Sequence, residues 1–269
     1  MVQTFGVTVE VSAPAGLMEA VRSVLPPRAV PATDRPALGC FALLPSGRRG
    51  LVDLRCDGAS FSGICDVALA LGMLDSQMRL HIASSAPDHV FVHAGVVGVG
   101  GRAIVLPGRS FAGKTTLVAA LVQVGAQYWS DEYAVLDADG LVHPYAKPLS
   151  IRGPDLQAED HTVESLGGRA GEEPLSVALI ALTHYRPGAA WAPERSMSGV
   201  GAIKMLEHAV PARARPEQSL AAVRRAADGA LVLLGERGEA EEAAAALIAE
   251  VSRTRVAQEA GAQGPRTHP

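Results

Sequence analysis

The sequence predicts a mixed α/β (α+β) protein: a core of mixed β-sheets flanked by helices, preceded by a small N-terminal α+β unit. An apolar run at 103–107 leads into a glycine-containing loop, and an apolar helical segment begins at 114. Two β-rich runs, 90–99 and 102–107, are joined by a Gly-Gly pair of the kind that tight hairpins favour. Further strand-length apolar runs alternate with helical periodicity towards the C-terminus.

The first 60 residues have the elements of a small unit. FGVTVEVSAP at 5–14 alternates apolar and polar residues as a strand does, and AGLMEAVRSVL at 15–25 follows as a helix. After a proline-rich connection, CFALL and GLVDLRC indicate two strands joined by a PSGRRG turn. We therefore expect residues 1–60 to form the N-terminal α+β unit.

The remaining elements are expected in residues 61–252. The segment at 64–83 has helical spacing, and QYWSDEYAVLDADGLVHPY indicates a short strand, an acidic corner and a hairpin that turns at DADG. Residues 253–269 are polar and contain Gly and Pro, so we expect a disordered tail. The other expected elements are strands at 174–185 and 230–236, helices at 199–210 (with Ser198 as cap) and 216–227, and a closing helix at 239–251.

Composition excludes several classes of protein. The formal net charge of −4 argues against a protein that coats nucleic acid, which needs clustered positive charge. The three cysteines have no CxxC spacing, so neither a zinc motif nor a disulfide framework is indicated. There is no signal peptide pattern and no run near the roughly 20 apolar residues that span a bilayer. We expect a cytoplasmic protein whose partners include neither nucleic acid nor membrane.

The segment at 108–115, GRSFAGKT, matches the phosphate-loop pattern Gly-x4-Gly-Lys-[Ser/Thr] in full, between an expected strand and an expected helix. Such a loop wraps backbone N–H groups around a phosphate, and the N-terminus of the following helix points at the same charge. The lysine would neutralise β- and γ-phosphate oxygens, and the threonine hydroxyl would hold Mg²⁺. The residues expected to bind ATP are Gly108, Arg109, Ser110, Phe111, Ala112, Gly113, Lys114, Thr115 and Thr116.

Two features flank this loop. His93 lies on the β-rich run before it, and Asp131 and Glu132 follow the helix after it. Taken alone, an Asp-Glu pair is often a solvated turn, and a single histidine is more often a core residue than a catalytic one. Their positions on either side of a complete phosphate loop favour a functional interpretation of Asp131. For His93 they make a functional and a structural role equally well supported.

The layout resembles a known family. A histidine segment (VHAG), a short hairpin, a phosphate loop, a helix and an acidic pair (SDE) occur in this order in the C-terminal domain of HPr kinase/phosphorylase. The HPr-kinase-related serine kinases found beside bacterial biosynthetic clusters are more similar still. The resemblance covers residues 64–152 well and 174–251 loosely. It implies a phosphoenolpyruvate-carboxykinase-like P-loop fold, and family members often form homo-oligomers.

The resemblance also implies roles for individual residues. Asp131 occupies the position of the general base, and His93 that of the histidine which contacts and tunes this carboxylate. Glu132 occupies the second acidic position and would support Mg²⁺ together with Thr115 and Asp131. The segment SIRG at 150–153 keeps the arginine of the family's Glu-Ile-Arg-Gly stretch, so Arg152 would face the γ-phosphate. Lys147 is a weaker candidate for that task.

The sequence departs from the family in ways that affect the expected substrate. Phe111 stands where the family usually has a small residue, and the first 60 residues do not resemble the regulatory domain of the HPr kinases. HPr is therefore not the expected substrate. We expect an ATP-dependent kinase that transfers the γ-phosphate to a hydroxyl, on a serine of a peptide or protein or on a small-molecule alcohol. The alternatives are a nucleotide-binding regulatory or assembly module with little transfer activity and, more weakly, a carboxykinase-like enzyme acting on a small acid.

Overall fold

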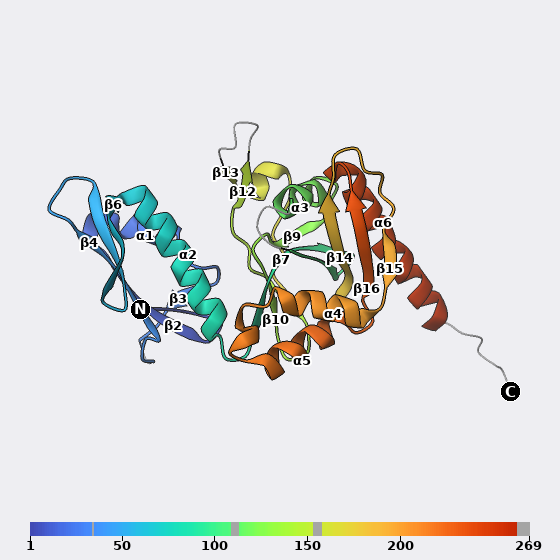
Figure 1. The fold of residues 1–269 in the computed structure, drawn as a ribbon, viewed down its shortest axis with the longest axis horizontal. Helices are drawn as coiled ribbons and strands as arrows, with labels where there is room; N and C mark the ends of the chain where they lie inside the picture. Colours follow the sequence, from blue (N-terminus) through green and yellow to red (C-terminus); the bar gives the residue numbers. More distant parts are fainter. Residues whose placement is uncertain (34, 109–112, 153–157, 263–269) are drawn as a thin grey trace. The chain divides into compact units, whose positions relative to one another are not determined.

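The computed structural model describes residues 1–33, 35–108, 113–152 and 158–262, and the chain divides into two compact units, Met1–His89 and Val90–Pro269 (Figure 1). The division falls later than the expected boundary at residue 60. The reason is helix α2 (Val67–Ser85), whose buried residues Leu74, Met78 and Ile82 form a stripe that packs on the sheet of the first unit.

The first unit is built on one six-stranded mixed sheet. β1 and β2 form a hairpin whose turn residues, Phe5 and Gly6, both have positive φ, as the tightest hairpin turns require. β2 and β4 are parallel, and the remaining pairs are antiparallel. The strands, in spatial order, are β3 (Val30–Pro31), β1 (Val2–Thr4), β2 (Val7–Ser12), β4 (Gly39–Pro45), β5 (Leu51–Cys56) and β6 (Ala59–Asp66).

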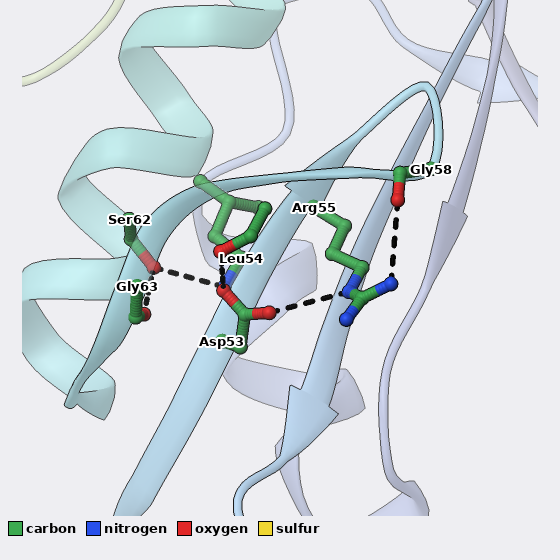
Figure 2. Close-up of polar contacts among 7 residues, drawn as sticks. Asp53, Leu54, Arg55, Gly58, Ser62 and Gly63 are labelled. Carbon is green, nitrogen blue, oxygen red and sulfur yellow. Dashed lines mark hydrogen bonds and ion pairs between the residues drawn. The ribbon is translucent and has the colours of Figure 1, made fainter.

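Strand β6 is an edge strand that the sequence did not predict. Residues 61–63 oppose Leu54 alone, and the Leu54 N–H donates to the Ser62 hydroxyl at 2.9 Å. Figure 2 shows this bulge beside Asp53, which accepts from Arg55 Nε at 3.2 Å and from the Ser60 hydroxyl at 2.6 Å. A bulge of this kind bends the strand and discourages further pairing at the edge.

Two helical segments accompany this sheet. The short helix α1 (Met18–Ser23) follows a 3-10 turn at Ala15–Leu17, within the range expected for a helix. Helix α2 begins at Val67 because the Asp66 side chain accepts a hydrogen bond from the Leu69 N–H at 2.9 Å, which caps the helix. The expected start at 64 was therefore too early, because residues 64–66 belong to β6.

The second unit contains an eight-stranded mixed sheet, as the sequence predicted in outline. The β7–β8 hairpin turns at Gly100 and Gly101, both with positive φ, and β8, β14 and β16 run parallel to one another. The strands, in spatial order, are β11 (Val142–His143), β10 (Tyr133–Leu136), β7 (Val90–Val99), β8 (Arg102–Pro107), β14 (Val177–Tyr185), β16 (Leu231–Arg237) and β15 (Glu194–Ser196), and β9 (Gln127–Ser130) also pairs with β7.

Helices cover both faces of this sheet (Figure 1). α3 (Lys114–Gln123) and α6 (Ala240–Ala262) pack in one apolar core with residues such as Ile104 and Leu233. α4 (Ser198–Glu207) and α5 (Pro216–Ala227) pack in a second core on the other face, with Val105 and Val232. The result is a three-layer arrangement in which alternate residues of the central strands point to opposite cores.

Two helix ends differ from expectation. Ser198 is the first residue of α4 and Met197 occupies the cap position, without a side-chain hydrogen bond. α6 extends to Ala262, so residues 253–262 are helical and not part of a tail. The segment contains several strong helix formers, and the helix-breaking Gly264-Pro265 pair comes only after it.

A small antiparallel pair, β12 (Leu149–Arg152) and β13 (Ala158–His161), completes the second unit, with 3-10 turns at Glu164–Leu166 and Val210–Arg213. β12 lies where a strand was expected in KPLSIRG, and its Leu149 is fully buried in the same core as α3. Over the described residues, none of the helices is long and apolar enough to cross a membrane.

Candidate functional site

The two described ends of the phosphate-loop motif, Gly108 and Gly113, lie at the edge of the sheet where three parallel strands end. The motif follows β8 directly, while β14 ends at Tyr185 and β16 at Arg237, which are paired in register. In open α/β sheets, ligands characteristically bind outside the carboxyl ends of parallel strands. The topology therefore places the motif where a ligand site is expected.

The two ends of the motif are well defined, while Arg109, Ser110, Phe111 and Ala112 lie outside the described residues. The Gly108 N–H donates to the His93 carbonyl at 3.2 Å, which ties the start of the loop to β7. Gly113 has a left-handed backbone conformation with φ of 74° and occupies the cap position of α3, without a side-chain hydrogen bond. The first N–H groups of a helix have no partner within it, so this end of α3 suits an anion.

The acidic corner is fixed next to the loop by backbone pairing. The Ala94 N–H donates to the Glu132 carbonyl at 3.2 Å, and Tyr133 pairs in register with His93. The fully buried Ser130 hydroxyl accepts from the N–H groups of Glu132 at 3.1 Å and Tyr133 at 2.9 Å, which shapes the turn. The strand ends that flank the motif in sequence thus meet in the fold.

The Thr115 hydroxyl donates a hydrogen bond of 2.8 Å to Oδ2 of Asp131, which joins the end of the motif to the acidic corner. Oδ1 of Asp131 is buried and has no hydrogen-bond partner among the residues that the structure describes. Burial raises the pKa of Asp131 from 3.8 to about 6, against the opposing effects of the Thr115 hydrogen bond and the Lys114 charge, and Glu132 adds to the rise. Asp131 is therefore a carboxylate that changes protonation state close to neutral pH.

Lys114 is the first residue of α3 and is partly buried beside this corner. Burial lowers the pKa of its ammonium group, and the negative charges of Asp131 and Glu132 act in the opposite direction. A cation, a helix N-terminus and a carboxylate thus converge on one small region. Thr116, the next residue of the expected nucleotide site, is exposed on the first turn of α3.

His93 and Glu132 are more accessible than Asp131. Nδ1 of His93 lies 3.9 Å from Oε1 of Glu132, and both side chains are about two-fifths exposed. The His93 ring also lies against Tyr133, with ring centroids 4.8 Å apart. The contact of His93 with the Asp131 carboxylate, which the resemblance implies, stays a prediction.

The two basic residues expected from KPLSIRG have different surroundings. Arg152 is the last residue of β12, and its side chain is outside the described part of the structure. The Lys147 carbonyl accepts a hydrogen bond of 2.8 Å from the buried Tyr128 hydroxyl, so the backbone of Lys147 has a structural role. A role of either side chain at a phosphate stays a prediction.

The residues of this site suit a magnesium ion bound together with a polyphosphate. Among the described residues there is no group of three or more His, Cys, Asp or Glu that would form a complete protein site. Mg²⁺ usually takes only one or two protein ligands, and phosphate oxygens and water supply the others. The Thr115 hydroxyl and the unpartnered Oδ1 of Asp131 meet that requirement.

One residue of the site was not found in the sequence. Arg237, at the end of β16, donates from Nη2 to the Gly113 carbonyl at 2.8 Å and has only 2% of its surface exposed. No local pattern marks it, because 124 positions separate the two residues. The available signal was its place at the end of a predicted strand, where side chains of an α/β sheet often reach a ligand.

Comparisons with known proteins give similarities among solved structures. No family model matches the sequence, and no curated protein matches it. Among solved structures, the Hpr(Ser) kinase/phosphatase from Coxiella burnetii aligns with 63% of this chain and 98% of its own, at 15% identity and a TM-score of 0.36. At this identity no residue role is transferred from that protein to this chain.

Proposed function

We propose that this protein is an ATP-dependent kinase that transfers the γ-phosphate to the hydroxyl of a serine in a peptide or protein, or of a small-molecule alcohol. The observation that carries the proposal is the hydrogen bond between Thr115, in a complete phosphate-loop motif, and the buried Asp131 carboxylate. A loop of the phosphate-binding type, in direct contact with a carboxylate of raised pKa, would provide a site for the triphosphate and a base for the alcohol, both of which this transfer uses.

Asp131 would act as the general base. With a pKa of about 6 it is mostly ionised at pH 7, yet basic enough to accept a proton as the attacking oxygen bonds to phosphorus. The oxygen–phosphorus bond to the acceptor forms while the bond between the γ-phosphorus and the β–γ bridging oxygen breaks. ADP leaves, and the proton on Asp131 is later released to water.

The remaining groups would hold the charge of the triphosphate. Lys114 and the N-terminal amides of α3 would bind β- and γ-phosphate oxygens, and Arg152 would approach the γ-phosphate as the resemblance implies. Mg²⁺, held by Thr115 and Asp131 with Glu132 in support, would screen the negative charge of the phosphates. The acceptor would enter beside His93 and Glu132, whose side chains are accessible.

Phosphoryl transfer itself provides the test. The protein is incubated with γ-labelled ATP, Mg²⁺ and a panel of serine peptides and small alcohols, and labelled products are separated from ATP. For the acceptor found, Asp131→Asn should lower the transfer rate about 10²- to 10⁴-fold and change ATP affinity only a few-fold, because a base acts in the transition state. Asp139→Asn, at an exposed carboxylate in the β10–β11 turn, is the matched control and should transfer at the wild-type rate.

Two results would contradict the proposal. Transfer by Asp131→Asn at the wild-type rate would remove Asp131 from the role of base. Tight ATP binding without transfer to any acceptor would instead favour a nucleotide-binding regulatory or assembly module that uses the same loop.

A further inference from the structure

Arg237 is a buried cation whose surroundings do not neutralise it. Its side chain is 2% exposed, and among the described residues no carboxylate lies within ion-pair distance of it. Nη1 donates to the Gly238 carbonyl at 3.1 Å, and Nη2 donates to the Gly113 carbonyl at 2.8 Å. Nε is buried and has no hydrogen-bond partner within the part of the chain that the structure describes.

The neighbours of Arg237 compensate its charge only in part. The guanidinium carbon lies 5.4 Å from the centroid of the Tyr185 ring, a distance at which a cation and an aromatic face attract. The Tyr185 hydroxyl in turn donates to Glu239 at 3.3 Å. Burial lowers the pKa of Arg237, and Tyr185 and Glu239 oppose this effect. Because guanidinium stays protonated at any pH a protein tolerates, the charge remains.

A buried charge without a partner is unfavourable, and a protein usually neutralises or pairs it. Arg237 cannot lose its proton and has no ion-pair partner in residues 1–33, 35–108, 113–152 and 158–262. An anion that enters the adjacent loop would provide the missing negative charge. The site proposed above places a polyphosphate there.

The contact with Gly113 gives this charge a specific effect. The Gly113 carbonyl also accepts from the Leu117 N–H at 3.2 Å, so two donors hold it at the start of α3. Since the peptide unit is planar, holding the carbonyl of Gly113 also sets the direction of the Lys114 N–H. A Cβ on residue 113 would come within 2.6 Å of Nη2, so any other residue there would displace the guanidinium from this contact.

We propose that Arg237 is a positioning residue of the phosphate loop, which orients the amides at the start of α3 and supplies countercharge for a bound polyphosphate. It does so from β16, on the opposite side of β8 from strand β7, which carries His93, and from the β9–β10 turn, which carries Asp131. The inference deepens the proposed function, because it requires the nucleotide site, but it does not depend on phosphoryl transfer.

Binding and stability measured on the same variants test this role. Arg237→Met keeps the length of the side chain and removes its charge and donors, while Arg237→Lys keeps the charge. Arg195→Met, on the neighbouring strand β15, removes an exposed arginine that is ion-paired with Glu250 and serves as control. Dissociation constants for ATP and for tripolyphosphate are measured by calorimetry, and unfolding temperatures are measured with and without each ligand.

We expect Arg237→Met to weaken binding of both ligands about tenfold or more, the size of a lost charge-assisted hydrogen bond. Without ligand, its unfolding temperature should equal or exceed that of the wild type, because an uncompensated buried charge has been removed. Arg237→Lys should recover most of the affinity, and Arg195→Met should bind as the wild type does. A residue with only a structural role would give a lower unfolding temperature without ligand.

Three outcomes would overturn the inference: wild-type affinity of Arg237→Met for tripolyphosphate, equal weakness of Arg237→Lys and Arg237→Met, or marked destabilisation of unliganded Arg237→Met. If Arg237→Met does not fold, the affinity of Arg237→Lys decides. Wild-type protein that binds ATP without transferring phosphate would contradict the kinase proposal alone. Wild-type protein that binds neither ligand would overturn both.

Discussion

The two sides of the phosphate loop carry buried charges of opposite sign, and the protein holds them in different ways. On the side of β7 and β9, the Asp131 carboxylate accepts a hydrogen bond from Thr115, a residue of the motif itself. On the side of β14 and β16, Arg237 donates to the Gly113 carbonyl, again within the motif. Two residues at the end of the motif, Thr115 and Gly113, are thus held by a carboxylate on one side and by a guanidinium on the other.

The difference between them is that only the acid can respond to burial by changing its charge. Burial raises the pKa of Asp131 to about 6, so it exchanges a proton near neutrality, which suits a group that takes part in proton transfer. Arg237 keeps its charge at every accessible pH, which suits a group whose counter-ion is a ligand. The same desolvation therefore produces a titrating group on one side and a permanent charge on the other.

The largest expected effect is on the pH dependence of stability when the Asp131 carboxylate is removed. The pKa of Asp131 is raised on folding from 3.8 to about 6, so the stability that protonation gives is complete below pH 3.8 and is lost as the pH rises through 6. At pH 8 the ionised carboxylate costs at most about 3 kcal/mol, which Asn does not incur. Denaturant unfolding should therefore show that the stability of Asp131→Asn relative to wild type increases between pH 4 and pH 8.

Asp139→Asn provides the control for this measurement, since its side chain is exposed in a turn. Its free energy of unfolding should follow that of the wild type across the same range of pH. A relative stability of Asp131→Asn that did not change with pH would mean that the carboxylate is not desolvated as the structure has it.

The next largest effect comes from disrupting the contact between Gly113 and Arg237. Gly113→Ala places a Cβ at a φ of 74° and within 2.6 Å of Arg237 Nη2. Gly125→Ala is a matched control, because Gly125 also has positive φ, at 102°, but has open space around it. Each should lose about 1 kcal/mol or more of stability from the strained backbone, and Gly113→Ala should also lose about tenfold in ATP affinity. Unfolding and calorimetry measure the two effects separately.

The double variant Gly113→Ala/Arg237→Met tests whether the two residues affect ATP affinity through the same contact. If the clash with Arg237 causes the loss, the double variant should bind ATP no more weakly than Arg237→Met does. Additive losses in affinity would show that Gly113 acts independently of the arginine.

The acidic side was largely predictable from the sequence, and the arginine side was not. The motif at 108–115 and the pair Asp131–Glu132 lie at the two ends of the consecutive elements α3 and β9, so the sequence, together with the family resemblance, led us to expect that they could meet. The contact between Gly113 and Arg237 depends on β14 and β16 pairing beside β8, which no local pattern specifies. Long-range pairing of parallel strands is the information that a single sequence lacks.

The same reason explains what was missed in the fold. The long hydrophobic strands and most helices of the second unit were predicted because their periodicity is strong. Strand β6 was missed because ASFSGICD is mostly exposed, contains a glycine with positive φ and has no clear alternation. The unit boundary was placed too early because the sequence shows that α2 is apolar but not which sheet it covers.

The smallest effect concerns His93 and Glu132, the two exposed residues next to Asp131. His93 and Glu132 are about two-fifths exposed, and Nδ1 and Oε1 are 3.9 Å apart, so solvent screens the pair and it contributes less than about 1 kcal/mol. His93→Gln should therefore lower phosphoryl transfer only a few-fold at pH 7. His161→Gln removes a comparable exposed histidine, 3.8 Å from Glu159, and should leave transfer unchanged. A hundredfold loss in His93→Gln alone would contradict this expectation. It would show that the histidine acts on Asp131 during the reaction, so that the groups that take part in transfer would include an exposed side chain as well as the buried carboxylate.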